Sequence, residues 1–193
     1  YYHPLYDIDD NTVTIEVKSS AIAASTAVAT KRYDSFTETD KTHFTYSILN
    51  GIHIEITGYS GSDETVVIPA QIDGYTVVKI GSDVFNSNTN LKTVVFPESL
   101  EEVGGYAFYR CYNLENIIFN STLECIGSHA FAECVSLEEI RFPNGLKKID
   151  SYAFGNTKIT EVELSDGVEE IYSHAFENCI NLTSFKYPLG WKN

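Results

Sequence analysis

The stretch from Ala130 to Phe154 reads AFAECVSLEEIRFPNGLKKIDSYAF, and it begins and ends on the same Ala-Phe pair. The pair, or its Val-Phe variant, occurs five times. The five phenylalanines are Phe85, Phe108, Phe131, Phe154 and Phe176, which are 23, 23, 23 and 22 residues apart. A fixed period in the twenties is typical of a solenoid, in which each unit buries its apolar residues against its neighbours. The period therefore predicts five repeat units between Val77 and Pro188, and it indicates a scaffold for binding or display.

Two short apolar runs recur inside every unit. In the quoted copy the first run is Leu137, Ile140 and Phe142, and the second is Leu146 and Ile149. The first run predicts a strand, a shorter run follows it, and the Ala-Phe pair closes the turn. Because the phenylalanines lie in the middle of the stack, we expect each of them to be fully buried.

The N-terminal part of the chain does not follow this period. We expect residues 1–41 to be a leader that is ordered at most in part, with one short strand at Val13–Val17, where apolar residues alternate with Thr14 and Glu16. Residues 42–76 are predicted to form a β cap, and residues 77–193 the solenoid itself, in about five repeats of 22–23 residues.

A hairpin is predicted inside the cap. Alternating apolar residues lie on both sides of Asn50-Gly51. Asn-Gly supplies the two positive φ angles that a tight hairpin turn needs. The hairpin would cover the apolar edge of the first repeat.

The composition excludes several classes of function. The 193 residues include 27 acidic and 13 basic side chains, a formal net charge of −14, which disfavours binding to nucleic acid or to anionic membranes. No apolar run approaches the ~20 residues that a membrane-spanning helix requires, so no membrane insertion is expected. The sequence contains no Met and begins at Tyr1, which favours a processed form or an excised module.

The repeat pattern L-x-x-I-x-F-P-x-x-L-x-x-I-x-x-x-A-F-x-x-C-x-x resembles the leucine-rich repeats of the BspA type. Leu137 to Pro143, Leu146 to Ile149, and Ala130-Phe131 with Cys134 match it closely, and the lead-in from Ile56 to Gly81 is also similar. Two copies lack the cysteine of this pattern, which is replaced by Asn88 and Thr157. Two copies lack the strand-ending proline, which is replaced by Asn120 and Ser165.

This resemblance implies a leucine-rich-repeat solenoid, a β-rich right-handed superhelix with short turns or helical pieces and an N-terminal β-hairpin cap. It also implies a microbial protein that is secreted or displayed at the cell surface, where it would bind extracellular proteins or glycans in adhesion. An architectural spacer within a larger secreted or surface-anchored protein is the alternative function.

The sequence contains no catalytic or metal-binding motif. Gly-x-Ser-x-Gly, His-Glu-x-x-His and phosphate-binding glycine loops are absent, and the cysteine spacings match no zinc signature, so we expect no enzyme activity, cofactor or metal. Asp7, Asp9 and Asn11 have the first offsets of a calcium loop, but Thr12 stands where glycine is required.

Three of the four cysteines occupy one repeat position. Cys111, Cys134 and Cys179 each follow the Ala-Phe phenylalanine by three residues, and we expect them to be small buried side chains. Neighbouring copies would lie within disulfide reach, although parallel side chains disfavour the bond. Cys125 has no obvious partner and is predicted to be the most reactive thiol.

The exposed positions of the first strand form the main candidate binding face. Two columns of side chains would run along the stack, and their centre is predicted to consist of Asn116, Ile118, Glu139, Arg141, Glu161 and Glu163. Glu139 and Glu161 would be adjacent like charges, which either a ligand or Arg141 could neutralise. Val95 and Ile118 would form an exposed apolar patch unless the N-terminal cap covers them.

A second candidate is an aromatic column immediately before the Ala-Phe pairs. Its members are Tyr106, His129, Tyr152 and His174. Such a column could stack on sugars or peptides, but a half-buried face of the turn is the interpretation that we favour. An uncapped C-terminal edge after Tyr187 would predict end-to-end association of the chains.

Overall fold

The computed structural model describes residues 36–188 and 190–191. The chain divides into two compact units, residues 1–37 and 38–193, and the fold described below is that of the second unit. The predicted strand at Val13–Val17 and the rejected calcium-like loop lie outside the described residues.

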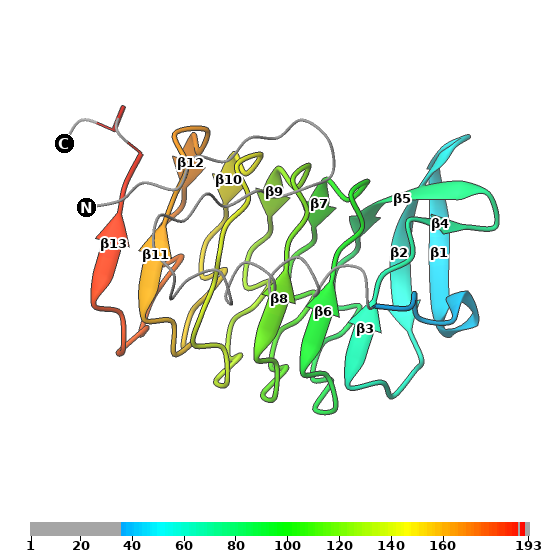
Figure 1. Ribbon diagram of the computed structural model, residues 1–193, viewed down its shortest axis with the longest axis horizontal. Helices are drawn as coiled ribbons and strands as arrows, with labels where there is room; N and C mark the ends of the chain where they lie inside the picture. The colour runs from blue at the N-terminus through cyan, green and yellow to red at the C-terminus, as the bar shows by residue number, and fades with distance from the viewer. Residues whose placement is uncertain (1–35, 189, 192–193) are drawn as a thin grey trace, which may run out of the picture. The chain divides into compact units, whose positions relative to one another are not determined.

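The second unit is a solenoid in which short strands form two rows (Figure 1). One row contains β3 (Thr65–Val67), β6 (Thr93–Val95) and β8 (Asn116–Ile118), followed by β11 (Glu161–Glu163) and β13 (Ser184–Lys186). The other row contains β1 (Phe44–Asn50), β2 (His53–Tyr59), β4 (Gln71–Ile72), β5 (Tyr75–Ile80), β7 (Glu102–Val103), β9 (Cys125–Ile126), β10 (Lys148–Ile149) and β12 (Glu170–Ile171). Among the described residues the only helix is a single 3-10 turn, Lys41–His43.

Parallel pairing places equivalent residues of successive turns beside one another. Val94 lies opposite Ile117 in the first row, and Val103 lies opposite Ile126 in the second. Side chains alternate between the two faces of a strand, so the apolar positions of both rows point into one continuous core. The predicted solenoid is therefore confirmed.

The phenylalanines form a stack through the centre of this core. Consecutive rings from Phe85 to Phe176 have centroids 4.8, 5.0, 5.3 and 5.4 Å apart, and their planes differ by no more than 9°. The first four rings are at most 1 % exposed. Each inner ring thus contacts an identical ring on both sides, which explains the strict repetition of the residue type.

The buried cysteines satisfy backbone carbonyl groups. Cys111 Sγ donates to the Phe85 oxygen at 3.1 Å, and Cys134 and Cys179 make the same contact one turn back at 3.2 Å. Thr157, which replaces the cysteine, donates to the Phe154 oxygen at 2.9 Å. All four cysteines are free. At the remaining copy of this position, the Asn88 side-chain oxygen instead accepts from Asn90 N and Leu91 N.

The first copy of the repeat begins before the expected boundary at residue 77. β3 pairs with β6 in register, Val66 opposite Val94, so it is the first strand of the repeat row although the sequence places it in the cap. Five additional residues between this strand and Phe85, which include β4, lengthen the unit and hide it from the Ala-Phe period.

The predicted hairpin is present as β1 and β2, which pair from Phe44–Tyr59 to Asn50–His53. Its turn differs from the expectation. Gly51 has a φ of 41°, but Asn50 does not have the positive φ that the expected turn needs. The pairing of the two strands instead shifts in register between Ile48 and Asn50. The hairpin tip projects, since Ile48 and Ile52 are 53 % and 65 % exposed.

The N-terminal end of the phenylalanine stack is covered by the hairpin. The Tyr59 ring lies 4.9 Å from Phe85, and Phe44 lies 5.1 Å from Tyr59. The Tyr59 hydroxyl donates to Asp63, and burial together with this bond raises the pKa of Tyr59. Residues before the hairpin also join the solenoid, because the Thr39 hydroxyl accepts from the Val67 N–H at 2.9 Å.

Candidate functional site

The strand face is the outer surface of the first row, and its six predicted residues come from three successive turns. Asn116 and Ile118 belong to β8, and Glu161 and Glu163 belong to β11. Glu139 and Arg141 lie in the turn between them, where the backbone is not assigned to a strand and the row is interrupted. All are exposed except Ile118, which is half-buried.

The charges on this face are only partly paired. Glu163 forms an ion pair with Lys186 of the next turn at 3.3 Å. Among the described residues no carboxylate forms an ion pair with Arg141, so its guanidinium does not neutralise Glu139 and Glu161. The expected apolar patch is reduced, because Val95 is only 8 % exposed.

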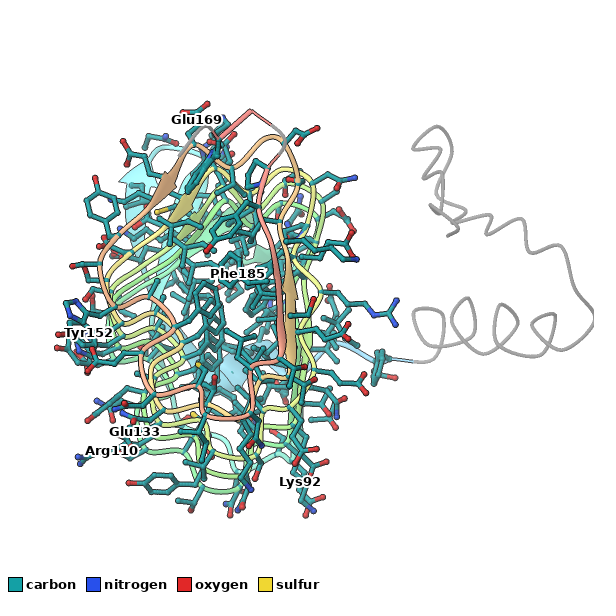
Figure 2. The ribbon with its side chains drawn as sticks, turned by 90° about the vertical axis from the view of Figure 1, so that its left-hand side faces the viewer. Lys92, Arg110, Glu133, Tyr152, Glu169 and Phe185 are labelled. Atoms are coloured by element: carbon teal, nitrogen blue, oxygen red, sulfur yellow. The ribbon has the colours of Figure 1, made fainter. Side chains whose placement is uncertain are left out.

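The four residues of the aromatic column do stack. Tyr106, His129, Tyr152 and His174 have ring centroids 4.6, 4.8 and 4.9 Å apart, with planes within 17° of parallel. All four have positive φ, from 57° to 65°, a conformation that bulky residues seldom adopt. Figure 2 shows Tyr152 on one side of the cross-section and the β11–β13 sheet on the other.

This stacking limits what the column can bind. A sugar or peptide would stack on a ring face, but the inner faces of the column are already covered by the neighbouring rings. The column instead presents ring edges, with tyrosine hydroxyls and imidazole nitrogens. The Ser128 hydroxyl lies 2.9 Å from His129 Nδ1 and donates to the Ser151 oxygen, which fixes that ring. Ligand binding by this column stays a prediction.

A second column of positive φ was not identified from the sequence. Its members lie two residues after each phenylalanine and are Ser87, Arg110, Glu133, Asn156 and Asn178. Figure 2 shows Arg110 and Glu133 on the same side as Tyr152. Asn156 Nδ2 donates to Glu133 Oε1 at 3.0 Å, and the Arg110 guanidinium lies over the Tyr109 ring. The fixed offset from phenylalanine was the available signal.

Cys125 is less accessible than expected. Its side chain is half-buried on β9, and burial, followed by the carboxylate of Glu102, raises its pKa. A raised pKa reduces the thiolate fraction at neutral pH, which argues against a reactive thiol. Burial also raises the pKa of Cys111 to about 12 and that of Cys134 well above its ordinary value.

The described residues contain no group of three His, Cys, Asp or Glu side chains that could hold a metal ion. Within the same part of the chain, no helix has the length and apolar character needed to cross a membrane.

Residues 62–192 match the BspA type leucine-rich repeat region in six copies. The chain belongs to this family. The sixth copy is the early unit that begins with β3. Proteins of the family are generally non-catalytic.

Two solved structures of leucine-rich repeat proteins are similar. The protein of T. pallidum is 37 % identical with a TM-score of 0.79, and the match covers 81 % of this chain and 74 % of that one. The protein of Bacteroides ovatus is 27 % identical with a TM-score of 0.70, and the match covers 80 % and 41 %. No curated protein matches the chain.

Proposed function

We propose that this chain is a non-catalytic extracellular or cell-surface module that binds a protein partner through the strand face. The family assignment supports a binding or accessory module. A repeat array holds exposed side chains at fixed spacing on a rigid surface, so it can recognise a partner without a preformed pocket.

The observation that carries the proposal is the incomplete charge pairing on the strand face. Arg141 is exposed and has no ion-pair partner among the described residues, and Glu139 and Glu161 on adjacent turns also have none. Like charges at strand spacing disfavour each other, so a cationic group placed between them would be stabilised. A partner surface with basic residues opposite the glutamates and a carboxylate opposite Arg141 fits this arrangement.

A protein partner is favoured over a glycan on geometric grounds. Aromatic faces that could stack on sugar rings are covered within the aromatic column. The strand face offers charged groups in rows, the arrangement that gives orientation and specificity in protein association.

We also propose that β1 and β2 act as the N-terminal cap and that the superhelix is right-handed. The cap is supported by the coverage of Phe85 by Tyr59 and by β1 forming the outermost strand of its sheet. A terminal unit of this kind keeps the apolar edge of a solenoid from solvent.

The test is an array of extracellular proteins and glycans probed with the chain and with its Arg141→Ala/Glu163→Ala double variant. The matched control is Lys147→Ala/Glu169→Ala, which removes the same charges from exposed positions outside the strand face. We expect the first variant to lose binding about tenfold, the scale of one lost charge contact, and the control to bind normally.

Melting temperatures decide whether a loss reflects the site. Both variants should melt within about 2 °C of the parent, because exposed ion pairs contribute little to stability. Equal loss of binding in the control, or unfolding of the double variant, would reject the strand face. An array without any binding would support the spacer function instead.

A further inference from the structure

The sequence contains two Asn-Gly pairs, and the fold places them in contrasting surroundings. Asn50-Gly51 forms the tip of the β1–β2 hairpin at one end of the solenoid (Figure 1), and Asn144-Gly145 lies in a turn between two repeat segments. Both asparagine side chains are exposed. Because glycine has no Cβ, its backbone nitrogen can approach the preceding asparagine side chain with little hindrance. The two pairs therefore share their intrinsic chemistry and differ in what surrounds them.

The hairpin tip is open on all sides. Residues 47–52 are all exposed, and a Cβ built on Gly51 would meet no atom within 4 Å. A bond from Ile52 N to the Asn50 oxygen closes the turn at an exposed position. The backbone between Asn50 and Gly51 can therefore rotate without displacing a packed neighbour.

Asn144-Gly145 is enclosed by the turns on both sides. A Cβ on Gly145 would collide with the Ser121 oxygen of the preceding turn. In the following turn, a Cβ on Gly167 would lie 3.1 Å from the Asn144 oxygen, which also accepts from Ser165 Oγ at 3.4 Å. Rotation of the backbone between Asn144 and Gly145 therefore has to displace two neighbouring turns.

The side-chain amide of Asn50 is also polarised by its neighbour His53. Asn50 Oδ1 accepts from His53 N at 3.2 Å, and Asn50 Nδ2 lies 3.3 Å from His53 Nδ1. A backbone N–H can only donate, so this bond fixes which end of the amide is the oxygen. A donor on Oδ1 stabilises the negative charge that develops there when a nucleophile adds to the amide carbon. An imidazole beside Nδ2 can protonate the departing nitrogen.

We propose that Asn50 is a self-modification site, which converts to aspartate and isoaspartate by intramolecular deamidation. Gly51 N loses its proton to a solvent base and attacks Asn50 Cγ, and the Cγ–Nδ2 bond breaks. The His53 imidazolium gives a proton to the departing amine, so that ammonia leaves, and solvent reprotonates the histidine. Water then opens the cyclic succinimide. Addition of water at Cγ gives aspartate, and addition at the main-chain carbonyl carbon gives isoaspartate.

The overall change is hydrolysis of an amide to a carboxylic acid and ammonia, and it alters the surface of the cap without reaching the core. Strand β1 carries no charged side chain, so the new carboxylate is the first charge on this strand. Phe44 and Tyr59, through which the hairpin covers the phenylalanine stack, pair at the opposite end of the two strands. The tip therefore changes from neutral to anionic while the cap keeps its contacts.

Peptide mapping by mass spectrometry measures the two pairs separately. The folded chain is incubated at mildly alkaline pH, and samples taken over time are digested with trypsin. Trypsin releases residues 42–79 and 142–147, each with a single asparagine, and replacement of NH2 by OH raises the peptide mass. We expect Asn50 to convert at least about tenfold faster than Asn144, the ratio given by a barrier about 1.4 kcal/mol higher at Asn144.

The same chain unfolded in guanidinium chloride is the matched reference. Both pairs lose their surroundings there, so the two asparagines should convert at similar rates. In the folded chain, His53→Ala removes the imidazole but keeps the backbone N–H, and it should slow conversion of Asn50 about tenfold while leaving Asn144 unchanged. Asn50→Asp, which has the side chain of one product, should melt within about 2 °C of the parent.

Three results would overturn the proposal. Equal rates at Asn50 and Asn144 in the folded chain would show that the fold does not select between the pairs. An Asn50 that stays unconverted while the unfolded chain reacts fully would show that the hairpin protects it. An unchanged rate at Asn50 in His53→Ala would remove the imidazole from the reaction.

Discussion

Removal of one ring from the middle of the phenylalanine stack is the perturbation that most directly tests how the solenoid is held together. Phe131 is fully buried and lies between Phe108 and Phe154, with centroids 5.0 and 5.3 Å away. Its substitution by alanine leaves a space that the neighbouring turns cannot close, because their backbones are fixed by hydrogen bonds on both sides.

The expected cost follows from burial and position. Phe→Ala in a closed core costs about 3–5 kcal/mol, which combines lost transfer energy with the cavity that remains. Phe176 is half-buried and has one stacked neighbour instead of two, so Phe176→Ala should cost only about 1–2 kcal/mol. Phe131→Leu keeps most of the volume and loses two stacked contacts, worth about 1–3 kcal/mol together.

Urea unfolding followed by circular dichroism measures these three differences. Phe131→Ala should lower the free energy of unfolding most, and Phe131→Leu and Phe176→Ala should lower it clearly less. Phe131→Ala should also lower the melting temperature by about 10 °C. Equal losses for Phe131→Ala and Phe176→Ala would refute the reasoning, because position in the stack would then have no influence on the cost.

Two further predictions concern the backbone and the buried thiols. A Cβ on Gly104 would lie 2.8–2.9 Å from backbone atoms of Gly81, Ile80 and Ser82, so Gly104→Ala should lower the free energy of unfolding by about 1–3 kcal/mol. A Cβ on Gly105 would have its nearest contact at 3.3 Å, so Gly105→Ala should cost clearly less. The same urea titration measures both. Burial raises the pKa of Cys111 from 9.0 to about 12, so its contribution to stability is complete below pH 9 and is lost as the pH rises towards 12. Between pH 8 and 10 the unfolding free energy should therefore fall by about 1.4 kcal/mol more for the parent than for Cys111→Ala, and identical pH profiles would contradict the assigned burial of this thiol.

The core could be predicted from the sequence because the same apolar residue types return at a constant interval. The period missed the copy in which β4 lengthens the interval, although Val66 and Val67 of that copy match Val94 and Val95 of the next repeat strand. Alignment on strands rather than on phenylalanines would have found it.

The aromatic column shows where sequence reasoning ends. Its members share a repeat position, so their alignment along the stack was predictable. The orientation of the rings was not, because it depends on a positive φ at Tyr106 and His129, positions where residue preferences point to glycine or asparagine. The row interruption at Glu139–Arg141 was equally hidden, since this segment has the same alternation as the paired strands.

Alternate residues of the same strands serve folding and binding. The inward residues form the core, and the outward residues form the strand face. The inward column Val94, Ile117, Val162 and Phe185 is apolar throughout, whereas the outward positions beside it are Thr93, Asn116, Glu161 and Ser184. In the strands of this row, neighbouring turns hold the backbone in place by parallel pairing whatever the outward residue is. Arg141 lies between the paired strands, and its side chain is exposed. Changes at Arg141 and Glu163 therefore alter what the surface presents without altering the packing beneath it, which is why binding and melting temperature should respond separately to the double variant.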